Sequence, residues 1–238
     1  MKKKTFYKYK SLDNFEFLLD ILLRERLYAS RFCELNDPME GVIEVEQTVP
    51  RELEEKWEAI LNELRICCFT PDNENTLMWA HYADGGRGCM IEFELHDDYK
   101  PLEVSYAKKP IICKSELTTE KAIKILQYKD KSWKYEREYR CITSSMFVPI
   151  TVKKIILGPR VPRSTFELLE GILNCCKPNL RLYQNKGNGD SVFKSISVSI
   201  GARRVGFRNQ DGNSDCIECL KIEHYRGRLL KYRDKIEI

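Results

Sequence analysis

Apolar positions along the chain follow two spacings, one typical of helices and one typical of strands. Helical spacing predicts helices at 11–23, 50–64, 76–82, 119–128 and 165–175, with Ser11 as the expected cap of the first and Pro50 at the first turn of the second. Runs rich in β-branched and aromatic residues predict strands at 6–10, 27–30, 65–70, 88–95, 102–106, 138–143, 153–157 and 180–184. Because helices and strands alternate irregularly, we expect an α+β fold with mixed, mainly antiparallel sheets and helices packed on them.

Composition narrows the class of protein. The chain has 238 residues, of which 42% are hydrophobic and 32% charged, and these fractions exclude collagen-like, coiled-coil and disordered proteins. A chain of this length buries a core without disulfides or a structural metal. We expect one core domain at residues 1–200 and a C-terminal extension at 201–238, where alternating apolar residues predict a hairpin.

Net charge and cysteine usage indicate the compartment. A formal charge of +4 does not by itself indicate a nucleic-acid or membrane partner. The chain has ten cysteines but no secretory leader and no apolar run near 18 residues, so we expect a cytoplasmic protein with reduced cysteines and no membrane contact. Cys216 and Cys219 with His224 offer three zinc ligands without a convincing fourth, so no metal is expected. Oligomeric state stays open.

The densest group of charged and aromatic residues spans 133–140. On an extended strand, Glu136, Glu138 and Arg140 would share one face. Two neighbouring carboxylates with an arginine beyond them can keep one acid ionised and raise the pKa of the other, which suits acid and base chemistry. The alternative is an edge strand with a solvated charged face.

Two further segments carry candidate site residues. Trp79, His81 and Tyr82 lie on the short helix before a glycine pair, where His81 either contacts a ligand or is an ordinary helix-end histidine. Asn36 and Asp37 precede a proline, so they either serve a turn or line a site.

The order of several motifs resembles a widespread prokaryotic family, catalogued as domain of unknown function family 2971. The motifs are residues 7–11, 27–30, 36–40, 77–83 with 88–93, 133–140 and 155–159. Together they span roughly residues 6–185. The family label carries no established reaction.

A more distant resemblance is to ADP-ribosyltransferases, which cleave the nicotinamide–ribose bond of NAD through an oxocarbenium-like state. A polar-aromatic first strand, a second strand that ends in serine and a late Glu-x-Glu strand carry this resemblance. It implies a split sheet, with NAD as co-substrate. The implied catalytic residues are Glu138 on the ribose and Glu136 on the acceptor. The implied cofactor-binding residues are Lys8, Tyr9, Tyr28, Ser30, His81, Tyr82 and Arg140, with Asn36, Asp37 and Trp79 elsewhere in the pocket.

Within that resemblance each residue has an expected place. Lys8 or Tyr9 stands where the family has an arginine or histidine, and Ser30 stands at the second-motif hydroxyl. Tyr28 or Tyr82 would stack on nicotinamide.

Three functions follow from these features. The first is an ADP-ribosyltransferase-like enzyme that modifies a nucleic-acid or protein acceptor. The second is a non-catalytic module of a prokaryotic stress or phage-defence system, which binds a nucleotide or a partner through aromatic residues. The third is a nucleic-acid binder that uses basic residues of the tail, namely Arg203, Arg204, Arg208, Arg226 and Arg228.

Overall fold

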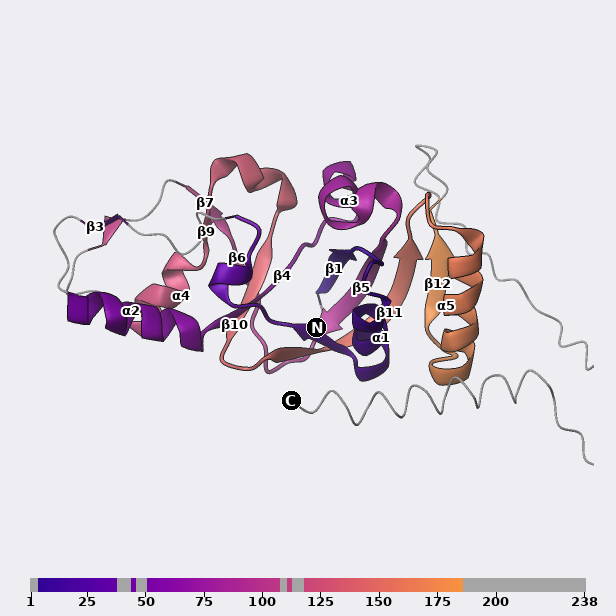
Figure 1. The fold of residues 1–238 in the computed structure, drawn as a ribbon, viewed down its shortest axis with the longest axis horizontal. Coiled ribbons are helices and arrows are strands. Elements are labelled where there is room, and N and C mark those ends of the chain that lie inside the picture. Colours follow the sequence, from indigo (N-terminus) through magenta and orange to yellow (C-terminus); the bar gives the residue numbers. More distant parts are fainter. Residues whose placement is uncertain (1–3, 38–43, 46–50, 108–110, 113–117, 186–238) are drawn as a thin grey trace, which may run out of the picture. The chain divides into compact units, whose positions relative to one another are not determined.

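The computed structural model describes residues 4–37, 44–45, 51–107, 111–112 and 118–185 (Figure 1). It contains helices and mixed, mainly antiparallel sheets, which confirms the α+β prediction. The predicted extension at 201–238, with its hairpin, its basic residues and its Cys-x-x-Cys, lies outside the described residues. Among those that are described, no helix has the length and apolar character needed to cross a membrane.

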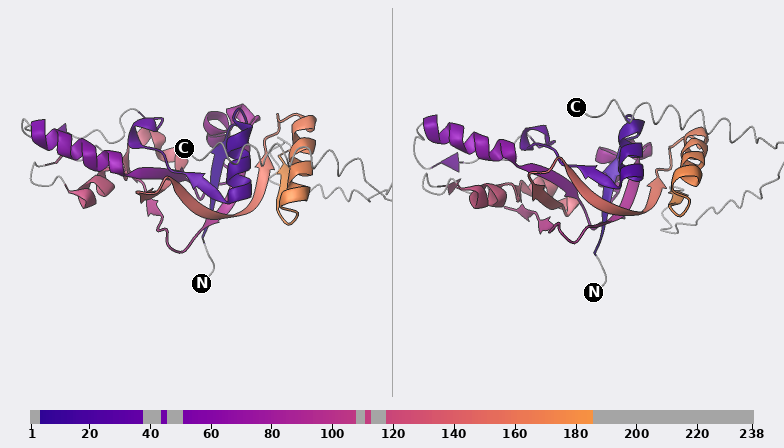
Figure 2. Two further views of the ribbon diagram at one scale, coloured as in Figure 1. Left: turned by 60° about the horizontal axis from the view of Figure 1, so that its bottom comes forward. Right: turned by 90° about the horizontal axis from the view of Figure 1, so that it is seen from below.

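The larger sheet has five strands, and its longest member is β11 (Phe147–Leu157). Its order is β1 (Thr5–Lys10), β5 (Cys89–Leu95), β11 and β12 (Arg181–Gln184), while β2 (Arg26–Tyr28) pairs with the first residues of β11. Only the β11–β12 pairing of this sheet is parallel. β11 curves along its length (Figure 2) and shifts register against β5 between Val152 and Lys154.

Helices α1 (Phe15–Arg24) and α5 (Arg163–Cys176) contribute to one apolar core with this sheet. Leu18 of α1 and Phe166 of α5 belong to the same buried cluster as Phe93 of β5. The start of α1 differs from the prediction: the helix begins at Phe15, and the Ser11 hydroxyl accepts a hydrogen bond from the Asp13 backbone N–H at 3.1 Å instead of capping the helix.

The opposite face of the sheet packs against α3 (Thr76–Tyr82). Met78 of this helix lies in a second buried cluster with Tyr9 of β1 and Met90 of β5. The Asn75 side chain accepts a hydrogen bond from the Leu77 N–H and so caps α3. α3 therefore lies beside β1.

The smaller sheet has three antiparallel strands in the order β4 (Arg65–Phe69), β10 (Tyr139–Thr143) and β6 (Leu102–Glu103). Helices α2 (Arg51–Glu63) and α4 (Thr119–Ile125) pack together through Trp57, Leu61 and Ile125. Two-residue strands form two parallel pairs, β3 (Glu44–Val45) with β8 (Ile111–Ile112) and β7 (Ser105–Tyr106) with β9 (Tyr128–Lys129). The strand predicted at 102–106 is thus divided between β6 and β7.

Backbone bridges join the two sheets. Tyr7 and Thr70 exchange hydrogen bonds of 2.7 and 3.0 Å, and Ser30 and Ile66 exchange bonds of 2.9 and 2.8 Å. Within the larger sheet, the backbone after β11 passes close to the turn before β5: a Cβ atom at Gly158 would lie 2.1 Å from the Gly86 carbonyl oxygen. The bridges place β1, the residues after β2 and β4 around a common space.

Candidate functional site

A pocket of about 290 Å³ occupies this common space. Residues of β1, β2, β4, α3 and the segment 129–138 line it. Eight of the twelve candidate residues are among them, namely Lys8, Tyr9, Tyr28, Ser30, Asn36, Tyr82, Glu136 and Glu138. The structure therefore brings the amino-terminal aromatic segment and the late acidic pair to one cavity.

The two glutamates reach the pocket through a tight turn and not along a strand. Residues 131–136 form a 3₁₀ helix, η4 (Lys131–Glu136), because the Asp130 carboxylate caps it by accepting the Ser132 N–H at 2.9 Å. Arg137 then adopts a left-handed conformation, with φ 48°. The chain therefore does not follow the predicted extended path here, but the turn still leaves Glu136 and Glu138 on the same side.

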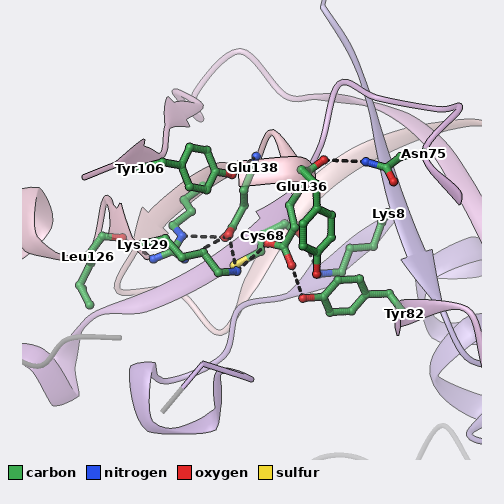
Figure 3. Close-up of polar contacts among 11 residues, drawn as sticks. Lys8, Cys68, Asn75, Tyr82, Tyr106, Leu126, Lys129, Glu136 and Glu138 are labelled. Carbon is green, nitrogen blue, oxygen red and sulfur yellow. Dashed lines mark hydrogen bonds and ion pairs between the residues drawn. The ribbon is translucent and has the colours of Figure 1, made fainter. Parts of the chain in front are cut away.

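Lys129 lies between the two carboxylates (Figure 3). Its Nζ atom is 2.6 Å from Glu136 Oε2 and 2.9 Å from Glu138 Oε2, so these two oxygens lie within about 5.5 Å of each other. Arg140 binds the other side of Glu138, with Nε 2.7 Å from Oε1, and also donates to the Leu126 carbonyl oxygen at 2.5 Å. Two cations and two carboxylates thus meet in one buried cluster.

Glu138 is the more acidic member of the pair. Burial alone would raise the pKa of its carboxyl, but Arg140 and Lys129 outweigh it and lower the pKa to about 2. Burial also acts to lower the pKa of Lys129, yet the attraction of Glu138 and Glu136 leaves it above the usual range. Its charge is held next to the pocket.

Glu136 has the opposite tendency. Burial raises the pKa of its carboxyl, and Lys129 offsets this only in part. The Tyr82 hydroxyl donates a hydrogen bond to Glu136 Oε1 (Figure 3). Burial and this hydrogen bond raise the pKa of Tyr82. The two neighbouring carboxylates therefore differ in acidity, which is the arrangement that a proton transfer beside a fixed negative charge requires.

The β1 side of the pocket carries the opposite charge. The Lys8 ammonium donates to the Cys68 carbonyl oxygen at 2.7 Å, and that of Lys10 lies 5.6 Å from the Phe17 ring centre. Neither lysine forms an ion pair with a carboxylate of the described residues. Burial, together with the charge of Lys8, lowers the pKa of Lys10. The two ammonium groups on this side favour an anionic group of a ligand.

Four of the candidate residues do not line the pocket. Arg140 is fully buried behind Glu138, so it contacts the carboxylate and not the cavity. Trp79 packs its ring edge-on against Tyr9, with 5.3 Å between ring centres, and His81 is exposed beside Tyr135. Asp37 is buried outside the lining.

Sequence reasoning missed Lys129. The side chain is 6% exposed and lines the pocket, yet its strand has only two residues, too few for a periodic signal. Tyr106 was missed for the same reason, although its hydroxyl accepts the Glu138 backbone N–H at 2.7 Å. A lysine four residues before the aromatic and acidic run was the available hint.

Metal ligation and similarity to known proteins give no further assignment. Within the part of the chain that the structure describes, no group of three histidine, cysteine or acidic side chains is arranged to hold a metal ion. No family model, no curated protein and no solved structure matches the chain. The resemblances to family 2971 and to ADP-ribosyltransferases therefore stay predictions from the motifs.

Proposed function

We propose that this protein binds NAD in the pocket, cleaves its nicotinamide–ribose bond and transfers ADP-ribose to an acceptor. The observation that carries the proposal is the meeting of Glu136 and Glu138 with the β1 segment and Ser30 in one cavity. The two glutamates lie more than 100 residues after β1 and Ser30 in the sequence, and the fold still brings them together.

The chemistry of the acidic pair supports this reaction. Cleavage of a glycosidic bond develops positive charge on the ribose, and a fixed carboxylate beside it stabilises that charge. Glu138, ionised and held by Arg140, suits this role. Glu136 has the higher pKa of the two and a hydrogen bond from Tyr82, so it suits the role of taking a proton from the acceptor.

The other side of the pocket supports a dinucleotide. Lys8 and Lys10 supply two ammonium groups for the diphosphate, as point charges and without the two-pronged geometry of arginine. Tyr28 is 47% exposed, and Tyr82 lines the same cavity, so either ring can stack on a base.

One observation favours a second candidate, a binding module without chemistry. Both oxygens of Glu138 accept from Arg140 or Lys129, and a buried ion-pair cluster of this kind also occurs for structural reasons. In that case the pocket binds a nucleotide, and the acidic cluster only shapes its wall.

Titration with NAD separates the two candidates. Calorimetry measures the Kd of NAD and of ADP-ribose, and chromatography measures nicotinamide release with candidate acceptors present. For the enzyme we expect Glu136→Gln to keep NAD affinity within about 3-fold and to lower release and transfer by about 100-fold or more. Glu138→Gln removes the charge that Arg140 and Lys129 both contact, so its stability must be measured alongside its activity.

A matched control is Glu103→Gln. Its carboxylate also accepts a tyrosine hydroxyl, that of Tyr139 at 3.1 Å, but it lies outside the pocket lining. We expect this variant to behave as the wild type. Saturable NAD binding without nicotinamide release, unchanged in Glu136→Gln, would support the binding module. No NAD binding at all would refute both candidates.

A further inference from the structure

The position of Lys129 carries an inference that no motif provides. Of the described residues, it is the one whose side chain contacts both pocket glutamates, and the pocket reaches it directly. We infer that Lys129 is a positioning residue, which holds Glu136 and Glu138 side by side and facing the cavity for the reaction. This inference rests on the proposed NAD chemistry.

The backbone around Lys129 fixes its ammonium with respect to Glu138. Lys129 pairs with Tyr106 in the parallel β7–β9 register, and the Ser105 N–H donates to the Gln127 carbonyl oxygen at 2.7 Å. The Tyr106 hydroxyl accepts the backbone N–H of Glu138. One strand pair therefore holds both the backbone and the carboxylate of Glu138.

The side chain of Trp133 restrains the ammonium further. Its ring centre lies 4.9 Å from Lys129 Nζ, and Trp133 belongs to η4, the same short helix that carries Glu136. A cation over an aromatic face is attracted by the ring. The ammonium thus has an aromatic ring and two carboxylates around it, and all of these are held on short, well-connected segments.

Without this cation the two carboxylates would repel each other. They lie close together with little water to screen them, so one would turn away or take up a proton. The other charged and titratable groups that face the cluster are Arg140 from β10, Cys68 from β4, Tyr82 from α3, Tyr106 from β7 and Tyr135 from η4. Arg140 binds Glu138, whereas Lys129 binds both Glu136 and Glu138.

The test compares Lys129→Met with Lys129→Arg in the full chain. Methionine keeps the length of the side chain and removes its charge, whereas arginine keeps the charge. We expect Lys129→Met to bind NAD within about 3-fold of the wild-type Kd while kcat for nicotinamide release falls about 100-fold or more. We expect Lys129→Arg to recover at least about a tenth of the wild-type kcat.

The pH profile distinguishes positioning from a general loss of stability. In Lys129→Met the acidic limb of kcat should move to higher pH by about one unit or more, because the carboxylates lose their shared cation. The matched control is Lys153→Met, which breaks the ion pair with Glu94 at 2.8 Å outside the pocket lining and should leave kcat and its profile unchanged. A kcat for Lys129→Met within about 3-fold of wild type, or no recovery in Lys129→Arg, overturns the inference.

Two measurements keep the inference testable if a variant or the proposed function fails. If Lys129→Met does not fold, the double variant Lys129→Met/Glu136→Gln replaces it, because it removes one charge of each sign. A kcat of the double variant equal to that of Glu136→Gln alone overturns the inference. A lower kcat supports it. If the wild type releases no nicotinamide, the proposed function has failed. The glutamates of the ligand-free wild type and Lys129→Met are then labelled with ¹³C, and their carboxyl groups are titrated with pH by NMR. An additional carboxyl protonation between about pH 5 and 8 in Lys129→Met supports the positioning role, and an unchanged titration overturns it.

Discussion

Replacement of Arg140 by methionine tests how strongly the buried charge cluster stabilises the fold. Arg140 is 0% exposed and donates to Glu138 at 2.7 and 3.2 Å and to the Leu126 carbonyl oxygen at 2.5 Å. Methionine cannot make these hydrogen bonds, so Glu138 would lose one of its two cationic partners. Removal of one partner from a buried pair costs about 3–5 kcal/mol, a large part of the stability of an ordinary domain.

Urea unfolding followed by tryptophan fluorescence measures this loss. We expect Arg140→Met to lower the free energy of unfolding by about 3–5 kcal/mol without a change in the m-value. Arg140→Met/Glu138→Gln should be less destabilised than the single variant, because it removes the uncompensated charge. In the control Arg51→Met, the side chain is 89% exposed and its ion pair with Glu55 should contribute about 0.5 kcal/mol or less. A loss in Arg140→Met as small as that of the control would refute a tightly coupled cluster.

Three further predictions concern single positions. Because the pKa of Glu138 is lowered to about 2, its charge stabilises the fold at neutral pH by about 3 kcal/mol, and this stabilisation is lost as the pH falls from about 5 to 2. Urea unfolding at several pH values should show that the free energy of unfolding of Glu138→Gln falls less steeply with acid than that of the wild type. Gly158→Ala should destabilise the protein by several kcal/mol. Gly171→Ala, in the interior of α5, places a Cβ atom that meets no atom within 4 Å and should stabilise the protein by about 0.5–1 kcal/mol. Thermal unfolding of both variants checks this, and equal changes in Tm would contradict it. Tyr82→Phe removes the hydroxyl that donates to Glu136, so the free energy of unfolding should fall by about 1–2 kcal/mol and the pKa of Glu136 should rise further; carboxyl titration by NMR measures the second effect, and a lower pKa would contradict it.

Local patterns predicted the elements whose boundaries depend on local contacts. α3 is capped by Asn75 and ends before the glycine pair, as its sequence indicates, and β5 follows the expected apolar run. α1 begins later than predicted because the Ser11 hydroxyl binds Asp13. Glu136 was expected to share one face of an extended strand with Glu138 and Arg140. It lies instead at the end of the 3₁₀ helix that Asp130 caps, a local contact that the alternation of residue types does not reveal.

The candidate site was predictable in its residue types more than in its contacts. Glu136 and Glu138 share one side, as a strand would have placed them, but the left-handed turn at Arg137 produces this arrangement. Lys129 completes the cluster through β7 and β9, and a pairing of two residues leaves no periodic signal in the sequence. Side-chain contacts that depend on such short pairings between separate segments can be found from the three-dimensional fold and not from the sequence pattern.

The long strand β11 determines when the larger sheet can be completed during synthesis of the chain. β2, which leads to Ser30, has its strand pairing with β11, and β5 has one edge open until β11 joins it. A ribosome therefore releases residues 1–146 before the larger sheet can close, and the pocket walls wait for the same event. We expect nascent chains that end before β11 to lack the completed larger sheet, so nearly two thirds of the chain must emerge before that sheet can form.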